Sequence, residues 1–258
     1  MLFLLRYDTE HKDAYGMSGF FERIIDVHRA HEIPATFFCT GGAIDVRETD
    51  FRMFHDEVEV DPLFDIQDHS YTHIGIGYEA GKPLEVLRAD YERSIASHER
   101  VFGTRPTGIS ICGTSGADGK RLKGFDETDK SRAELDMLVG LGIHMVNSFL
   151  VDHSESREFL NYARLGHPDV MGYPSSYSDT SWMYRAEKGD PIKYILGQIT
   201  DRAARGEHVP LMLHDWVAWM HADDQELSHV IHIVDHARSL GYELATHLDC
   251  YANTGLWR

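Results

Sequence analysis

Apolar and polar positions follow two alternating patterns along most of this chain. Short continuous apolar runs, typical of strands buried on both faces, are separated by longer segments with helical spacing of apolar residues. The expected strands cover residues 2–7, 33–39, a segment ending near 66, 108–112, 143–147, 170–172, 209–213 and 242–246. The expected helices cover residues 19–31, 83–102, 131–141, 191–205 and 224–240, with Gly103 as a C-cap of the second.

This alternation predicts an α/β fold in which a parallel sheet is covered by outer helices. The chain contains no linker, low-complexity tract or internal repeat, and its 258 residues suit one large α/β domain. We therefore expect a single domain over residues 1–258. A β/α barrel is the closed architecture that best fits the alternation.

Composition indicates a globule with an ordinary core and an acidic surface. Apolar residues make up 42% of the chain and charged residues 26%. The 25 basic and 42 acidic residues give a net charge of −17. This balance argues against binding of nucleic acid or of an anionic membrane through a broad basic face.

The cysteines and the N-terminus bear on cellular location. Cys39, Cys112 and Cys250 have no CxxC spacing, so they indicate neither a disulfide framework nor a zinc knuckle. The apolar residues 1–5 are too few for a signal peptide, and no run of about 18 apolar residues could span a membrane. We expect a cytoplasmic protein with reduced thiols.

Polar residues that could carry chemistry follow several of the expected strands. His69 and His73 are four residues apart, a spacing that on one helical turn points both imidazoles at a single ion. Asp8 and Glu10 are two apart at the end of the first strand, so both can face the same side. His214 ends a later strand.

Together these residues are the parts of a hydrolytic metal site. Zinc-type catalysis uses three His or carboxylate ligands, a separate carboxylate can accept a proton from water, and a separate His can protonate the leaving group. The alternative for His214 is a capped structural histidine. The histidines of the last helix are expected to be surface or packing residues, since they belong to the outer ring: His229, His232 and His236.

Four motifs occur in the order seen in polysaccharide deacetylases, also called carbohydrate esterase family four or the chitooligosaccharide deacetylase homology domain. They are Asp8-Thr9-Glu10, Ala35-Thr36-Phe37-Phe38-Cys39-Thr40-Gly41, Asp65-Ile66-Gln67-Asp68-His69-Ser70-Tyr71-Thr72-His73 and Leu211-Met212-Leu213-His214-Asp215. The resemblance extends from Leu2 to about Asn253. It implies a distorted (β/α)7 TIM-like barrel that removes an N-acyl or O-acyl group with one divalent metal ion.

The same resemblance implies roles for the site residues. Asp8-x-Glu10 resembles the Asp-x-Asp spacing of the branch that includes sugar deformylases, with Asp8 as base and Glu10 as metal ligand, although the two roles could be exchanged. His69 and His73 complete the ligand set, and His214 donates a proton to the departing nitrogen.

Ser110 occupies the position at which family members usually carry an Arg beside the base aspartate. Loss of that cation is expected to raise the pKa of the carboxylate and to loosen its position, which implies a departure from ordinary activity on acetylated sugar polymers. A backbone N–H near Cys112 and Gly113 is expected to stabilise the oxyanion.

The remaining assignments concern substrate and orientation. Asp152 and Asp215 are alternative partners that could orient His214. The tryptophans can stack on a sugar ring or serve in packing. The expected substrate-binding residues are Ser110, Asp179, Trp182 and Trp216.

The leading hypothesis is a metal-dependent hydrolase that removes an acetyl or formyl group from the nitrogen of an amino sugar or related small amide. One rival is cyclic amide hydrolysis, as in allantoinase-like relatives, and another is a catalytically silent carbohydrate-binding protein. Zinc is the expected metal, with cobalt, nickel, manganese and iron as alternatives that suit the same ligands. The expected partner is a small-molecule or carbohydrate substrate, and a homo-oligomer is compatible with the sequence.

Overall fold

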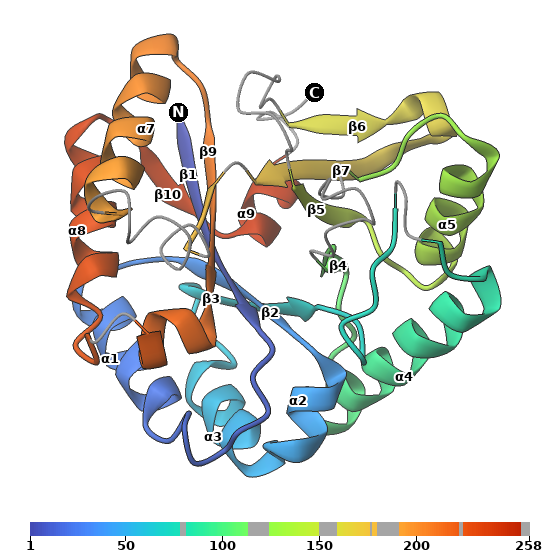
Figure 1. Ribbon diagram of the computed structural model, residues 1–258, viewed down its shortest axis with the longest axis horizontal. Helices are drawn as coiled ribbons and strands as arrows, with labels where there is room; N and C mark the ends of the chain where they lie inside the picture. The colour runs from blue at the N-terminus through green and yellow to red at the C-terminus, as the bar shows by residue number, and fades with distance from the viewer. Residues whose placement is uncertain are drawn as a thin grey trace.

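The computed structural model describes residues 1–77, 81–112, 124–149, 159–175, 177–179, 191–221 and 224–253. Its centre is a 10-stranded sheet surrounded by helices (Figure 1). In spatial order, the parallel part of the sheet consists of β7 (His167–Ser175), β5 (Met145–Phe149), β4 (Gly108–Ser110), β3 (Phe64–Asp68), β2 (Ala35–Cys39), β1 (Leu2–Thr9) and β9 (Val209–His214).

Three shorter strands extend this sheet. Antiparallel β6 (Leu160–Tyr162) lies beside β7, β8 (Tyr177–Ser178) lies beside β9, and β10 (Glu243–Ala245) pairs with the beginning of β1. The expectation of an α/β fold with a mainly parallel sheet is therefore confirmed, and this order of strands matches a distorted (β/α)7 barrel.

Helices cover the outside of the sheet (Figure 1). Their apolar faces pack on the strands, and the largest buried cluster joins α1, α3 and α8 to β1, β2 and β9. The helices are α1 (Phe20–Ala30), α2 (Gly41–Val46), α3 (Glu48–Val58), α4 (Leu84–Phe102), α5 (Asp129–Gly140), α7 (Pro191–Arg205), α8 (Ser228–Ser239) and α9 (His247–Ala252), with the short helical turns η1 (Ala163–Leu165) and η3 (Val217–His221).

β1 lies in the middle of the sheet, and all its residues are buried. It pairs with β9 along most of its length, with β2 along its second half, and with β10 at its beginning. Because successive side chains alternate, Tyr7 points outward and stacks on Phe37 with ring centroids 5.0 Å apart. Arg6 and Asp8 point to the opposite side, toward the barrel interior, where the site lies.

Several expectations about local structure are confirmed, and others are wrong. Helix α4 ends as expected at Gly103, whose φ of 67° is the left-handed conformation of a glycine C-cap. The helical turn expected at His69–His73 is wrong, because this stretch is a loop. The apolar patterns also gave no indication of the short elements α2, β6 and α9.

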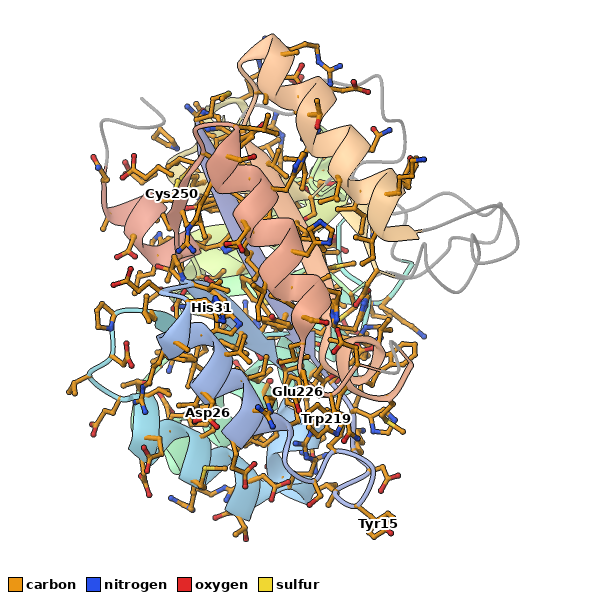
Figure 2. All side chains as sticks on the ribbon, turned by 90° about the vertical axis from the view of Figure 1, so that its left-hand side faces the viewer. Tyr15, Asp26, His31, Trp219, Glu226 and Cys250 are labelled. Carbon is orange, nitrogen blue, oxygen red and sulfur yellow. The ribbon has the colours of Figure 1, made fainter. Side chains whose placement is uncertain are left out.

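The loop between β1 and α1 projects from the molecule beside η3, where Gly16 and Gly19 face Met220 and Trp219. Figure 2 shows Tyr15 pointing away from the fold, and this side chain is 92% exposed. Among the described helices, none combines the length and the apolar character that crossing a membrane requires.

Candidate active site

The predicted site residues converge at the carboxyl ends of the parallel strands, the usual place for reactive groups in a β/α barrel. Asp8 and His214 are register partners on the adjacent strands β1 and β9, so both side chains project to the same face. Glu10 follows β1 directly, and His69 follows β3. His73 lies on the loop beyond His69 and comes back to Glu10.

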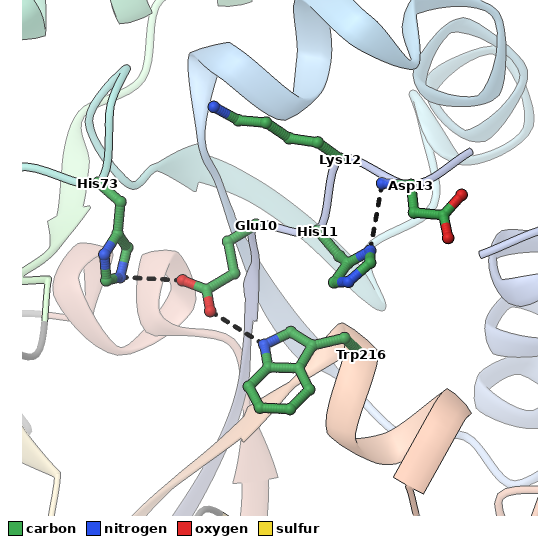
Figure 3. Close-up of a pocket in the computed structure, with 6 residues that line it drawn as sticks. All are labelled: Glu10, His11, Lys12, Asp13, His73 and Trp216. Carbon is green, nitrogen blue, oxygen red and sulfur yellow. Dashed lines mark hydrogen bonds and ion pairs between the residues drawn. The ribbon is translucent and has the colours of Figure 1, made fainter. Parts of the chain in front are cut away.

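Glu10 lies between the two imidazoles. Its Oε2 is 2.9 Å from Nε2 of His73 and 3.5 Å from Nε2 of His69. The other oxygen, Oε1, accepts a hydrogen bond of 3.0 Å from the indole Nε1 of Trp216 (Figure 3). The indole thereby turns Oε2 toward the histidines.

These three groups fit a divalent cation. Glu10 Oε2 and His69 Nε2 are buried and make no hydrogen bond of acceptable geometry, although buried polar atoms normally have a partner. Burial opposes ionisation of Glu10, but the close imidazoles of His69 and His73 outweigh it and hold the pKa of the carboxyl well below its usual range. A carboxylate facing two imidazole nitrogens is a ligand set that zinc and similar ions prefer.

Cys112 is a further potential ligand that the sequence analysis did not identify. Its buried thiol lies beside both histidines, and its Sγ and one nitrogen of each imidazole are all within 4.8 Å of one another. Burial lowers the proton affinity of His73, but interactions with Cys112 and Glu10 raise the pKa of the imidazole to about 10. The site therefore attracts positive charge strongly.

The loop that carries the histidines is shaped by its backbone. Ser70 and His73 have φ values of 60° and 62°, a left-handed conformation uncommon for residues other than glycine. Asp90 on α4 holds the loop, because its carboxylate accepts hydrogen bonds from the Tyr71 N–H at 2.7 Å and the Thr72 hydroxyl at 2.5 Å. This loop, and not a helix, brings the two imidazoles together.

Asp8 lies beneath the histidines, with only 3% of its side chain exposed. Its Oδ2 accepts a hydrogen bond of 3.1 Å from the Ser110 hydroxyl and lies 3.7 Å from Nε2 of His69. Its Oδ1 is 3.3 Å from Nε of Arg6. Ser110, an expected substrate-binding residue, is fully buried and its hydroxyl donates to Asp8, so its contact with a substrate stays a prediction.

His214 is paired with Asp179, a partner that the sequence analysis did not consider. Asp179 Oδ1 lies 2.7 Å from His214 Nδ1, and Asp179 Oδ2 accepts the His214 backbone N–H at 2.6 Å. Asp179, an expected substrate-binding residue, is fully buried, and its contact with a substrate stays a prediction. Burial lowers the proton affinity of His214, but the charge of Asp179 and its hydrogen bond raise the pKa of the imidazole to about 9.

Asp215 supports the other side of the site. Its Oδ1 accepts the backbone N–H groups of Glu10 at 3.3 Å and of Trp216 at 2.9 Å. Arg47 lies 3.6 Å from its Oδ2, yet burial dominates and raises the pKa of Asp215 to about 6. Asp215 thus fixes the backbone of a predicted ligand. Three other residues of the expected site, Gly113, Asp152 and Trp182, lie outside the described residues.

An open pocket of about 580 Å³ gives access to these groups (Figure 3). Trp216 lines it together with the exposed faces of Glu10 and His73, so the tryptophan both holds the carboxylate and offers an apolar surface to a bound ring. The rest of the lining is polar and comes from the loop after β1: His11, Lys12 and Asp13.

The pairing with Asp179 predicts a shift in pH dependence. As the predicted proton donor, His214 should support activity below its pKa of about 9 and lose it above that pH. In Asp179→Asn the amide oxygen can still accept the backbone N–H, but the negative charge is gone and the pKa of His214 falls. We expect the basic limb of the kcat/KM profile to move to lower pH.

A matched control is Asp136→Asn, which removes the carboxylate 2.6 Å from His167 on the outer part of β7. This variant should leave the basic limb in place. An unchanged limb in Asp179→Asn would contradict the assignment of His214 as the proton donor.

Comparison with known proteins points to one family. The sequence profile described as polysaccharide deacetylase matches residues 7–122, a segment that contains Asp8, Glu10, His69, His73 and Ser110. No curated protein sequence matches the chain. The family expected from the motifs is therefore the one that the profile search finds.

Solved structures of low sequence identity share the fold. A family 4 acetyl xylan esterase from Clostridium thermocellum, solved with a cobalt ion, is 13% identical with a TM-score of 0.59, and the match covers 99% of this chain and 93% of the esterase. A family 4 carbohydrate esterase from Bacillus subtilis is 16% identical with a TM-score of 0.57, covering 98% and 81%. A CE4 family pseudoenzyme from Bacillus anthracis is 12% identical with a TM-score of 0.58, and the match covers 97% of this chain but 65% of that protein.

Proposed function

Residues 7–122 carry the sequence pattern of the polysaccharide deacetylase family within the fold of carbohydrate esterase family 4, and on this basis we propose that the protein is a metal-dependent amide hydrolase. Its substrate is an N-acetylated or N-formylated amino sugar or a related small amide. The observation that carries the proposal is the convergence of Glu10, His69 and His73 on one point beside Asp8 and His214.

Glu10, His69 and His73 are the proposed metal ligands. Bound there, the metal supplies a Lewis acid that polarises the scissile carbonyl and makes water acidic enough to react near neutral pH. We propose zinc, because two imidazoles and a carboxylate with a nearby thiol favour it over the hard cations magnesium and calcium. The solved relative with cobalt supports a transition-metal site.

Asp8 is the proposed general base. Its Oδ2 faces the ligand site and would accept the proton of the attacking water, while Oδ1 is held by Arg6 from below. The carboxylate is therefore aimed in one direction, and this preorganisation is what general base catalysis requires. Exchange of roles with Glu10 is disfavoured by geometry, because Glu10 is the carboxylate that contacts both histidines.

His214 is the proposed general acid. Asp179 holds Nδ1, which leaves Nε2 as the nitrogen that can face the substrate. With a pKa of about 9, the imidazole carries a proton at neutral pH and can deliver it to the departing amine. His214 and Asp8 lie on neighbouring strands, so the two can act on opposite ends of the same scissile bond.

The fold alone does not guarantee catalysis, since a structural relative is a pseudoenzyme and a mutant of it has restored enzymatic activity. This chain retains two carboxylates and three histidines of a hydrolytic site, which supports an active enzyme. The Trp216 ring at the pocket supports a cyclic substrate.

The test is metal analysis of the purified protein beside turnover assays with N-acetylated sugars, N-formylated sugars and cyclic amides. We expect one transition-metal ion per chain and release of a free amine from an acylated amino sugar. Stoichiometric metal with no turnover would favour a silent carbohydrate-binding protein. Turnover of cyclic amides alone would favour the allantoinase-like rival.

A further inference from the structure

Arg6 is a buried cation next to the proposed base. It is fully buried within β1, and its Nε lies 3.3 Å from Oδ1 of Asp8. Its Nη2 donates to the sulfur of Met212 at 2.8 Å, and its guanidinium carbon lies 5.7 Å from the centre of the Phe38 ring. Met212 and Phe38 belong to the two strands that flank β1, so the guanidinium is enclosed from both sides.

We propose that Arg6, two residues before Asp8 on the same strand, is the positioning residue for Asp8. This proposal rests on the proposed function. Arg6 neutralises Asp8 and fixes one carboxylate oxygen, so that the other faces the reacting water.

The distribution of partners over the two oxygens of Asp8 supports this role. Oδ1 has the Arg6 ion pair and no hydrogen bond of acceptable geometry, whereas Oδ2 has the Ser110 hydroxyl and faces His69. A buried carboxylate is strongly destabilised unless a cation or hydrogen bonds compensate it. Among the described residues, Arg6 is the arginine that forms an ion pair with Asp8; burial lowers the pKa of its guanidinium, and the charge of Asp8 opposes that shift.

The local sequence explains why the cation can come from this position. In an extended strand, side chains two residues apart point the same way. The order Arg6, Asp8, Glu10 therefore places a cation, the base and a ligand in one row along the barrel interior. The hydroxyl of Ser110 donates to Oδ2 of Asp8, and Arg6 lies beside the other oxygen, Oδ1.

Arg6→Met tests the proposal, because methionine fills much of the same volume without charge. We expect kcat to fall about 100-fold, the size of loss typical of a displaced catalytic group, with little change in KM and an unchanged metal content. Arg6→Lys should recover part of the loss. The matched control is Arg202→Met, which removes another fully buried arginine, located on α7, and should leave kcat unchanged.

The double variant Arg6→Met/Ser110→Arg moves the charge from β1 to β4. If its activity lies within about tenfold of the wild type, and well above that of Arg6→Met, a positive charge at position 110 can replace the one at position 6. The missing charge next to Asp8 would then be the cause of the loss in Arg6→Met. The double variant keeps a positive charge beside the buried Asp8, so we expect it to fold. It therefore still tests the proposal if Arg6→Met does not fold. A folded Arg6→Met with wild-type kcat, or a folded and metal-loaded double variant without turnover, overturns the proposal. Lack of turnover in the wild-type protein would instead overturn the proposed function.

Discussion

His214→Ala is expected to lose turnover while it keeps its metal. General acid catalysis contributes about 10²–10⁴ in rate, and the departing amine of an amide depends strongly on protonation, so kcat should fall within that range. His214 is not among the proposed ligands, and the ligands lie on other strands and loops. Metal content per chain should therefore equal that of the wild type, which elemental analysis of the variant checks.

His167→Ala is the matched control for this variant, because His167 is also paired with an aspartate, Asp136, but at the far end of β7. Its kcat should stay at the wild-type value. Loss of metal in His214→Ala would show that this histidine belongs to the ligand set, and an unchanged kcat would remove it from catalysis.

His69→Ala is expected to lose both metal and turnover. His69 is fully buried, and its Nε2 points at Glu10 while Nδ1 lies 2.8 Å from the carbonyl oxygen of Ser110. Mutation of a residue that hydrogen-bonds to a metal ligand typically lowers metal affinity about 10–100-fold. Removal of a ligand itself should therefore lower metal affinity by at least about 100-fold. Competition with a chromophoric chelator measures this affinity without recourse to activity.

His98→Ala controls for the loss of a buried histidine. His98 lies on α4, with its Nε2 3.1 Å from the carbonyl oxygen of Cys39 and 3.5 Å from Oδ1 of Asp68. It should lose stability but bind metal as the wild type does. Wild-type metal affinity in His69→Ala would refute the ligand assignment, whereas loss in both variants would indicate a general effect on the fold.

Much of the fold could be predicted from the sequence because buried parallel strands leave a local signal. The runs at β1, β2 and β9 are apolar on both faces, and the site residues were found as the polar residues that follow them. Short elements such as α2 lack such a signal. Its first residues are Gly41 and Gly42, and it depends on the side chain of Thr40, which accepts the Ala43 N–H.

The interactions that support the site could not be predicted, because their partners are distant in sequence. Asp179 and His214 meet through the pairing of β8 with β9, and their separation of 35 positions gives no indication of this contact. The four-residue spacing of His69 and His73 fits a helical turn, but a loop held by Asp90 brings the imidazoles equally close. Cys112 reaches them only because β4 lies beside β3.

The row formed by Arg6, Asp8 and Glu10 makes the chemistry of this protein dependent on the register of β1. A slip of one residue between β1 and its neighbours would turn every second side chain outward, so that the guanidinium and both carboxylates would leave the interior at once. Tyr7 and Thr9 would take their places. An insertion or deletion of a single residue within this strand should therefore abolish the site completely. A single substitution at one site residue, in contrast, removes only the role of that residue.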